Sequence, residues 1–410
     1  MADKLHVVEL FSGIGAQAKS LKKISKRHQL DINFVGTCEW DIHPIVAYFL
    51  INGGNPKKAH QLKISKTDLI NSLTSKNLTY DGKKPISLKF LTTFSEDFLK
   101  LVYTAIQETN NFVDITKLSA NQLPKKIDLL TYSFPCQDLS NIGSLHGFNK
   151  GIDRNAKNRS SLLWEVERLL IESKESKRSL PKTLLMENVS SILAPRHKEN
   201  FEIWKKFLEG LGYYNKVYKL YAPNFGIPQN RTRVFMISVL SNKNKILDDY
   251  FNNNDLEKYV QKKQIDLSYF INTKDNVFYD EWLESQPNKT PSRKTIWKNN
   301  LQLFKNGTFQ TKITNTLTTK QDRHPNSGNI EFYGNQKKSN YRFLTPRECF
   351  LLMGFENSDY ESLTSEVIFS RKHHKLFTRD VLYKLAGNSI VVEILDQIFE
   401  QILFLQKKIL

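Results

Sequence analysis

The chain has 410 residues, of which 40% are hydrophobic and 11% aromatic. This size and composition indicate two or three folded domains and exclude both a disulfide-stapled miniprotein and a disordered chain. A formal net charge of +18 favours a polyanionic partner, nucleic acid first, although a merely basic, lysine-rich surface is the simpler alternative.

The three cysteines form no CxxC pair, so we expect neither a disulfide framework nor a metal site. The first residues run directly into a strand-like apolar segment without a secretory signal. No apolar run approaches the roughly 20 residues of a membrane span. We therefore expect a cytoplasmic protein with no membrane partner.

The N-terminal pattern is a strand over 5–10, a glycine turn over 13–15, a helix to about 28 and a strand over 32–38. Further strands and helices then alternate. Strands are predicted at 127–133, 183–188 and 233–240, and helices at 160–173 and 199–212. This order predicts an α/β fold with a doubly wound, mostly parallel sheet and a second, smaller domain.

Changes in composition suggest the domain borders. Residues 1–241 form the first domain, with a Lys, Ser and Thr-rich helical insertion at about 55–112. Residues 242–341 form the smaller domain, and 342–410 return to the first through apolar helices over 344–355 and 382–406. Between residues 286 and 342 there are 11 basic and 2 acidic residues, a net charge of +9, which is typical of a phosphate-facing surface.

The segment Phe11-Ser12-Gly13-Ile14-Gly15 lies between a strand and a helix, where glycines let backbone amides approach a nucleotide-like ligand. Taken alone, the segment could equally be an ordinary tight turn. Glu39 and Trp40 end the next strand and offer a carboxylate for ribose hydroxyls and a flat face for a purine. Together these residues predict a nucleoside cofactor.

Reactive groups follow two other predicted strands. Cys136 comes after a buried strand, where ligand chemistry occurs in this architecture, and could be a nucleophile. Most cysteines in such proteins are inert core residues, but the adjacent proline and the Gly and Asn-rich loop argue against simple burial. Glu187 ends another apolar strand, where burial could let it act as an acid, although Asn188 could simply cap a helix. Arg231 and Arg233 would point the same way in an extended strand. Such a pair suits an anionic or carbonyl-rich ligand, although a surface face of salt bridges is the commoner explanation.

Six strings in this order resemble the DNA (cytosine-5) methyltransferase family. They are FSGIG (11–15), SFPCQDLS (133–140), MENV (186–189), QNRTR (229–233), RECFLLMGF (347–355) and AGNSIVVEIL (386–395). The resemblance covers about three quarters of the chain. Ala16 stands where many members have a second glycine, and the insertion at about 55–112 lengthens the gap before the cysteine. Neither departure affects a catalytic residue.

The resemblance implies a Rossmann-like class I methyltransferase fold and transfer of a methyl group from S-adenosylmethionine to C5 of a flipped-out cytosine. Cys136 would add to C6, Glu187 would protonate N3, Arg233 would hold O2 and Arg231 would support the site. The cofactor-binding residues would be Phe11, Gly13, Gly15, Glu39, Trp40, Asp114, Ile115, Pro135, Leu162, Asn388 and Ile390.

The basic 242–341 segment would be a target recognition domain for double-stranded DNA. The residues expected to contact DNA are Gln137, Ser140, Ser161, Gln229, Thr316, Leu317, Gln321, Arg323 and His324, each of which could instead touch only phosphate. We expect a monomer. A cognate restriction endonuclease acting separately, or a phage-type role, would fit.

Three other functions compete with this interpretation. An RNA cytosine-5 methyltransferase would share the catalytic strings but usually lacks a recognition domain of this size. A DNA-binding protein without catalysis would be expected to have lost Cys136, Glu187 or Arg233, and all three are present. A nicotinamide-dependent oxidoreductase would favour a GxGxxG turn, whereas Ala18 occupies the third glycine position.

Overall fold

The computed structural model describes residues 4–135, 152, 159–261, 265–274 and 276–409. The chain divides into two compact units. The first comprises Met1–Leu220, Thr232–Lys258 and Leu395–Leu410, and the second comprises Tyr221–Arg231 and Tyr259–Ile394.

A six-stranded sheet forms the centre of the first unit, with strand order β2-β1-β3-β4-β6-β5. The β2, β1, β3 and β4 strands pair in parallel, and β6 pairs antiparallel with β4. The strands are β1 (Leu5–Leu10), β2 (Ile32–Cys38), β3 (Leu129–Tyr132), β4 (Thr183–Val189), β5 (Tyr213–Tyr221) and β6 (Thr232–Leu240).

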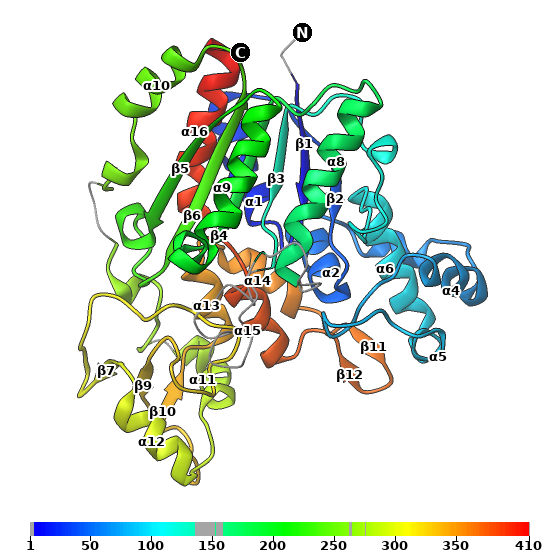
Figure 1. Cartoon of the computed structure of the whole chain (residues 1–410). Helices are drawn as coiled ribbons and strands as arrows, with labels where there is room; N and C mark the ends of the chain where they lie inside the picture. The colour runs from blue at the N-terminus through cyan, green and yellow to red at the C-terminus, as the bar shows by residue number, and fades with distance from the viewer. Residues whose placement is uncertain (1–3, 136–151, 153–158, 262–264, 275, 410) are drawn as a thin grey trace. The chain divides into compact units, whose positions relative to one another are not determined.

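Helices cover both faces of this sheet, with α8 and α9 in front and α1 and α16 behind in Figure 1. Alternate side chains of the central strands face each layer, so Val8, Leu130 and Met186 join one apolar core with Val166 and Trp204. The helices are α1 (Ala16–His28), α2 (Ile42–Ile51), α8 (Leu163–Glu175), α9 (Pro195–Gly210), α10 (Asn244–Asn253) and α16 (Val392–Lys408).

The segment predicted as a helical insertion contains four helices. They are α3 (Lys57–His60), α4 (Lys66–Thr74), α5 (Leu88–Leu91) and α6 (Glu96–Glu108). The α6 helix has an apolar face that is buried, including Phe98, Leu99 and Val102. The side chains of Ser65, Ser87 and Ser95 cap the starts of three of these helices by accepting backbone N–H bonds.

The second unit contains a four-stranded sheet, a separate hairpin and five α-helices among its described residues. The sheet order is β10-β9-β7-β8. The elements are α11 (Tyr279–Ser285), α12 (Pro291–Asn299), β7 (Gln302–Lys305), β8 (Thr308–Phe309), β9 (Asn329–Glu331), β10 (Tyr341–Phe343), α13 (Pro346–Leu351), α14 (Asn357–Thr364), β11 (Phe369–Arg371), β12 (His374–Lys375) and α15 (Arg379–Gly387).

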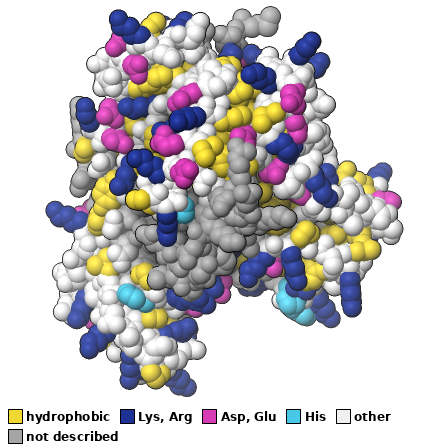
Figure 2. Space-filling view, in the orientation of Figure 1, with side chains coloured by type: hydrophobic (Ala, Val, Ile, Leu, Met, Phe, Trp, Pro, Cys, Tyr) yellow, Lys and Arg dark blue, Asp and Glu magenta, His cyan; other side chains and the backbone are white. Residues whose placement is uncertain are grey.

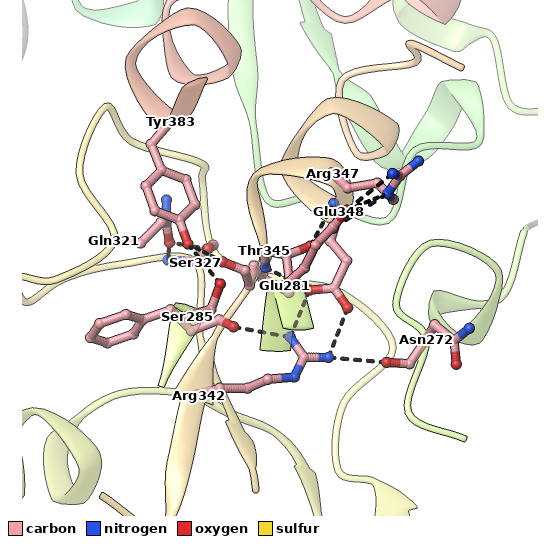
Figure 3. A network of polar contacts seen from close by, with 12 residues as sticks. Asn272, Glu281, Ser285, Gln321, Ser327, Arg342, Thr345, Arg347, Glu348 and Tyr383 are labelled. Carbon is pink, nitrogen blue, oxygen red and sulfur yellow. Dashed lines mark hydrogen bonds and ion pairs between the residues drawn. The ribbon is translucent and has the colours of Figure 1, made fainter. Parts of the chain in front are cut away.

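A buried ion pair connects β10 to α13 in the second unit (Figure 3). The two terminal nitrogens of Arg342 each lie 2.8 Å from one oxygen of Glu348. The Glu348 carboxylate also accepts the backbone N–H of Thr345, completing the capping box that starts α13. Because both charges are buried and paired, loss of either partner would leave an uncompensated charge in the interior.

The compact units follow different borders from the predicted domains. The α10 helix belongs to the first unit, and residues 342–394 group with the second. The functional division of the chain into residues 242–341 and 342–410 stays a prediction. Within the described part of the chain, no helix has the length and apolar character needed to cross a membrane.

Candidate active site

Residues from four motifs lie at the carboxyl edge of the first unit's sheet. Leu10, the last residue of β1, is in register with Cys38 of β2 and Tyr132 of β3, and Tyr132 is in register with Met186 of β4. The next residues along these strands are Phe11, Glu39, Ser133 and Glu187. Parallel strands therefore bring together side chains that are up to 176 residues apart in sequence. Ligands of open α/β sheets bind at this edge.

The glycine turn after β1 depends on left-handed backbone conformations. Phe11, Gly13 and Gly15 have φ values of 58°, 54° and 83°. A Cβ atom on Gly15 would lie 2.5 Å from the Asn52 side chain and 3.0 Å from the Tyr48 ring, so this position is closely packed. A Cβ atom on Gly13 would meet nothing within 4 Å, which leaves that side of the turn open to a ligand.

The Glu39 carboxylate connects the second strand to this turn. One oxygen accepts the N–H of Gly13 at 3.2 Å, and the other accepts the N–H groups of Trp40 and Asp41 at 2.9 Å. Burial raises the pKa of Glu39 to about 7, against the opposing effect of these hydrogen bonds. The carboxylate therefore organises the turn in addition to offering acceptors to a ligand.

The Glu39-Trp40 segment is fixed by residues on both sides. The side chain of Asn111 bonds to both the N–H and the carbonyl of Glu39, each at 3.0 Å. The N–H of Thr79, from the insertion, donates to the Trp40 carbonyl at 2.9 Å, and Thr79 in turn accepts from Ile42. The insertion therefore supports the loop that carries the expected cofactor residues.

Asp114, one of the expected cofactor-binding residues, also bonds to the insertion. Its Oδ2 accepts from the Asn77 side chain at 2.7 Å, and its Oδ1 accepts from the backbone and hydroxyl of Thr116. The neighbouring Ile115 is buried in the core beneath α8. Both residues lie in the same unit as the glycine turn, as the expected cofactor site requires.

The turn that leads from β3 to the expected nucleophile is held by two amides. Asn188 of β4 donates to the Phe134 carbonyl at 3.0 Å, and Gln17 of α1 donates to the Ser133 hydroxyl at 3.2 Å. Pro135 is half-buried after them. Cys136, Gln137 and Ser140 lie outside the described residues. Beyond that segment, Ser161 and Leu162 belong to a 3-10 turn (Arg159–Leu162) before α8.

Glu187 and Arg233 form an ion pair on neighbouring strands. Arg233 faces Val189 in the antiparallel β4–β6 register, two residues from Glu187, and its Nε lies 3.4 Å from Glu187 Oε1. Both side chains are largely but not fully buried, with exposed fractions of 15% for Arg233 and 11% for Glu187. The pair combines a carboxyl group and a guanidinium at the sheet edge, which suits recognition of a ring with adjacent N–H and carbonyl positions.

Arg231 has different partners from Arg233. Its guanidinium, buried in the second unit, donates to the backbone carbonyls of Leu317, Gly387 and Ser389 at 3.2, 3.2 and 2.8 Å. An extended strand through both residues would place the two arginines side by side as one pair. The structure instead gives each arginine its own partners. Residue 231 precedes β6, which begins at Thr232.

The Gln229 side chain, like that of Arg231, bonds to the backbone of the second unit at Leu317. Its side chain donates to the Leu352 carbonyl at 2.9 Å and accepts the Leu317 N–H at 3.0 Å, and both Gln229 and Leu317 are buried. The Thr316 hydroxyl donates to the Asn230 carbonyl. The side chains of Gln229 and Leu317 are therefore enclosed by the protein, whereas Thr316 is half-buried, and the expected DNA contacts of all three stay predictions.

The last motif ends α15. Gly387 lies against the 316–319 segment, because a Cβ atom there would come within 2.6 Å of the Thr318 backbone. Asn388 is exposed at the end of this helix, and Ile390 is 7% exposed. Both expected cofactor contacts belong to the second unit, and their place at the cofactor stays a prediction.

The 318–326 segment contains one buried residue that bonds within the protein and two exposed residues that a ligand could reach. Gln321 is 1% exposed, its amide donates to the Thr318 carbonyl, and its carbonyl oxygen accepts from Ser327 (Figure 3). Arg323 and His324 are exposed on the same loop. The geometry thus favours Arg323 and His324 over Gln321 as groups that reach a base.

The positive charge of the second unit lies largely on its surface. Figure 2 shows Lys and Arg side chains gathered over the lobe that holds α12 and β7, with few acidic ones. Lys294 and Lys298 are exposed four residues apart on α12, and Lys337 is exposed near β10. Three arginines of this unit, Arg231, Arg342 and Arg347, are buried instead, and Arg342 is paired with Glu348 and cannot contact phosphate.

Five residues shape this site through contacts that the sequence did not predict: Gln17, Asn77, Thr79, Asn111 and Asn188, the last of which was expected only as a possible helix cap. All act through hydrogen bonds to residues distant in sequence, which leave no periodic signal. The described residues also contain no group of three or more His, Cys, Asp or Glu side chains suited to hold a metal ion.

Comparison with known proteins identifies the family. Residues 93–403 match the family model for C-5 cytosine-specific DNA methylase. The chain belongs to this family. Over 97% of its length it is 36% identical to the orphan methyltransferase M.SssI of Spiroplasma monobiae, covering 97% of that protein. It is 30% identical to the type II methyltransferase M2.ScrFI of Lactococcus lactis subsp. cremoris, over 97% of this chain and 99% of that one.

A solved structure with the same fold is the Dnmt2 methyltransferase of S. pombe. The TM-score is 0.61 with 16% identity, over 99% of this chain and 100% of the other. The expected family, the α/β class I methyltransferase fold and the enzyme class, DNA (cytosine-5) methyltransferase, are confirmed. The roles of individual residues stay predictions.

Proposed function

We propose that this methyltransferase transfers a methyl group from S-adenosylmethionine to C5 of a cytosine that it flips out of a specific short sequence in duplex DNA, through a covalent Cys136–C6 adduct. The observation that carries the proposal is the register of the parallel strands. It aligns the glycine turn, Glu39, the Ser133-Phe134-Pro135 turn and Glu187 at one sheet edge.

The proposed chemistry starts with the Cys136 thiolate. Cytosine C5 is too weak a nucleophile to take a methyl group until addition at C6 pushes electron density toward N3 and C5. Glu187 would donate a proton to N3 as charge develops there, and Arg233 would hold the O2 carbonyl. After methylation, loss of the C5 proton and breaking of the S–C6 bond release 5-methylcytosine and the thiolate.

The residues at the sheet edge fit S-adenosylmethionine, which supplies an electrophilic methyl group when bound. Gly13 leaves space beside the turn, and Phe11 and Trp40 are half-buried aromatic rings suited to hold adenine. Gln17 has a buried side-chain oxygen with no hydrogen-bond partner among the described residues. An unpaired buried oxygen beside this turn would accept a donor from a bound ligand.

DNA recognition would divide between two sets of residues in the second unit. Exposed lysines, such as Lys294, Lys298 and Lys337, would contact phosphates and supply affinity. Arg323 and His324 would reach base edges, while the buried Gln229, Leu317 and Gln321 would hold the loop in position. A cytosine within a duplex must leave the stack before a side chain can attack its ring.

The biological setting we propose is DNA modification in the cytoplasm, either beside a separate restriction endonuclease or alone. The relatives differ on this point, since one is named a type II methyltransferase and another an orphan methyltransferase. The enzyme would act as a monomer.

Two measurements test the proposal. Bisulfite sequencing of plasmid from cells that produce the protein should reveal 5-methylcytosine in one short context. A duplex with 5-fluorocytosine at that position should trap the enzyme covalently, because fluorine blocks the final loss of the C5 substituent. Cys136→Ser should bind S-adenosylmethionine normally but neither methylate nor trap, and methylation by this variant at the parent's rate would contradict the proposal.

A further inference from the structure

An exposed basic hairpin in the second unit has no role in the site described above. The β11 and β12 strands pair in antiparallel fashion and form a separate two-stranded sheet (Figure 1). Residues 371–375 read Arg-Lys-His-His-Lys, and the stretch from 367 to 379 contains no acidic residue. This is a dense local concentration of cationic side chains outside the 286–342 segment.

The hairpin is anchored so that these side chains stay on its outside. Ser370 and Leu376 are fully buried, and the Leu376 N–H donates to the Ile368 carbonyl at 2.8 Å. Lys372 and His373 form the two-residue connection, where His373 has a φ of 61°. The buried positions fix the hairpin to its unit, while Lys372, His373, His374 and Lys375 are all exposed.

The two lysines have no acidic partner within the described part of the chain. Neither Lys372 nor Lys375 forms an ion pair there, although many other surface lysines do. Two acids flank the stretch: Asp380 lies 3.6 Å from Arg379, and Glu366 forms no ion pair among the described residues. A fixed element with unneutralised lysines and imidazole donors favours a ligand with closely spaced negative charges.

We propose that the β11–β12 hairpin is a phosphate-binding element that contacts the DNA backbone independently of the target recognition segment. This inference rests on the proposed function, because duplex DNA is the polyanion on which that function acts. Lysine binds phosphate as a point charge and reads no base, so the hairpin contributes affinity and not sequence preference.

The test compares two double variants that each remove two exposed lysines. Lys372→Gln with Lys375→Gln alters the hairpin, and Lys174→Gln with Lys177→Gln is the control at the end of α8. Binding to a labelled duplex is measured across a salt series. If both hairpin lysines contact phosphate, the slope of log affinity against log salt falls by about 2, and affinity at about 0.1 M salt drops roughly 10- to 60-fold. The control keeps the parent's slope, and the methylated context is unchanged in both.

A second readout needs no substitution. Bound duplex should protect Lys372 and Lys375 from acetylation, as followed by mass spectrometry, while Lys174 and Lys177 are labelled equally with and without DNA. If the parent binds and methylates DNA but the hairpin variant matches the control and its lysines are not protected, the hairpin inference is wrong. If the parent neither binds nor methylates DNA, the proposed function itself fails.

Discussion

The side-chain amide of Asn188 donates a hydrogen bond to the backbone carbonyl of Phe134, 3.0 Å away. Both residues are 2% exposed, so this bond lies in the interior. It connects the end of β4, which carries Glu187, to the turn that precedes Cys136. The proposed acid and the proposed nucleophile are therefore supported by one side chain.

Asn188→Ala should lower the rate of methyl transfer and of 5-fluorocytosine trapping, with cofactor affinity nearly unchanged. The loss of stability should be about 1 to 3 kcal/mol, since a buried carbonyl loses its donor. Asn215→Ala is a control in the same unit, because Asn215 also donates to a backbone carbonyl, that of Lys205 at 3.2 Å. Equal effects of the two variants on trapping would contradict a specific role for Asn188.

Trp40→Ala should weaken binding of S-adenosylmethionine by about 1 to 3 kcal/mol, the scale of a lost aromatic contact. Isothermal titration calorimetry without DNA measures this directly. Trp297→Ala, in α12 of the second unit, should leave cofactor affinity at the parent's value. Normal cofactor binding by the Trp40 variant, together with weaker DNA binding, would instead assign Trp40 to the DNA surface.

Thr79→Pro should also weaken cofactor binding, because it removes the N–H that supports the Trp40 carbonyl. Thr79→Ala keeps that N–H and is the matched control for loss of the side chain. Calorimetry with both variants separates the two effects. Similar affinities for the proline variant and the parent would mean that the insertion does not position the cofactor loop.

The buried carboxyl group of Glu9 should make the free energy of unfolding depend on pH. Burial raises its pKa from the usual 4.5 to about 7, against the lowering effects of the Tyr48 hydroxyl and Lys22. The folded chain therefore keeps a proton that the unfolded chain has released. This makes the contribution of Glu9 less favourable as pH rises from about 4.5 to about 7, and constant above that.

Glu9→Gln removes this titration while keeping an acceptor for Tyr48. The free energy of unfolding of this variant, relative to the parent, should increase by an amount on the order of 3 kcal/mol between mildly acidic and mildly alkaline pH. Denaturant unfolding across this range measures the difference. Burial also raises the pKa of Glu39 to about 7. Because both proteins contain Glu39, its contribution cancels in the difference between their free energies of unfolding. A difference independent of pH would be inconsistent with a raised pKa at Glu9.

Arg231 and Arg233 should respond oppositely to substitution. Arg231→Ala leaves three backbone carbonyls without this donor, and the bonds to two of them are buried, so it should destabilise the second unit by about 3 kcal/mol or more. Arg233→Ala should reduce methyl transfer strongly with a smaller change in stability. Thermal unfolding and single-turnover kinetics on both variants provide the comparison. A stable Arg231 variant with normal unfolding would contradict the structural role.

Arg323→Ala should change or relax the methylated context at one position, at a cost of about 1 to 3 kcal/mol in discrimination. Gln321→Ala should instead lower stability and weaken all contexts together, because its side chain holds the Ser327 loop. Bisulfite sequencing of plasmid methylated by each variant distinguishes the two results. A new context with the Gln321 variant alone would reverse the assignment.

The sequence predicted the central elements well because their apolar patterns are local. The strands over 5–10 and 32–38 and the helix that ends at His28 agree with β1, β2 and α1. The β5 strand was not predicted, since Tyr213–Tyr221 mixes lysines with partly exposed aromatic residues and shows no clean alternation. The sequence also did not predict which polar side chains are buried. Gln229 and Gln321 are polar residues in basic, polar segments, and only tertiary contacts reveal that both are interior.

The hydrogen bonds of Arg231 have a consequence for how the protein is made. Its partners Gly387 and Ser389 follow it by 156 and 158 residues. During synthesis, a segment containing Arg231 emerges from the ribosome long before these carbonyls exist. The second unit therefore cannot complete its interior until residues 387 to 389 have been synthesised, and a nascent chain that stops short of them would present this arginine unsatisfied, as a substrate for chaperones and proteases.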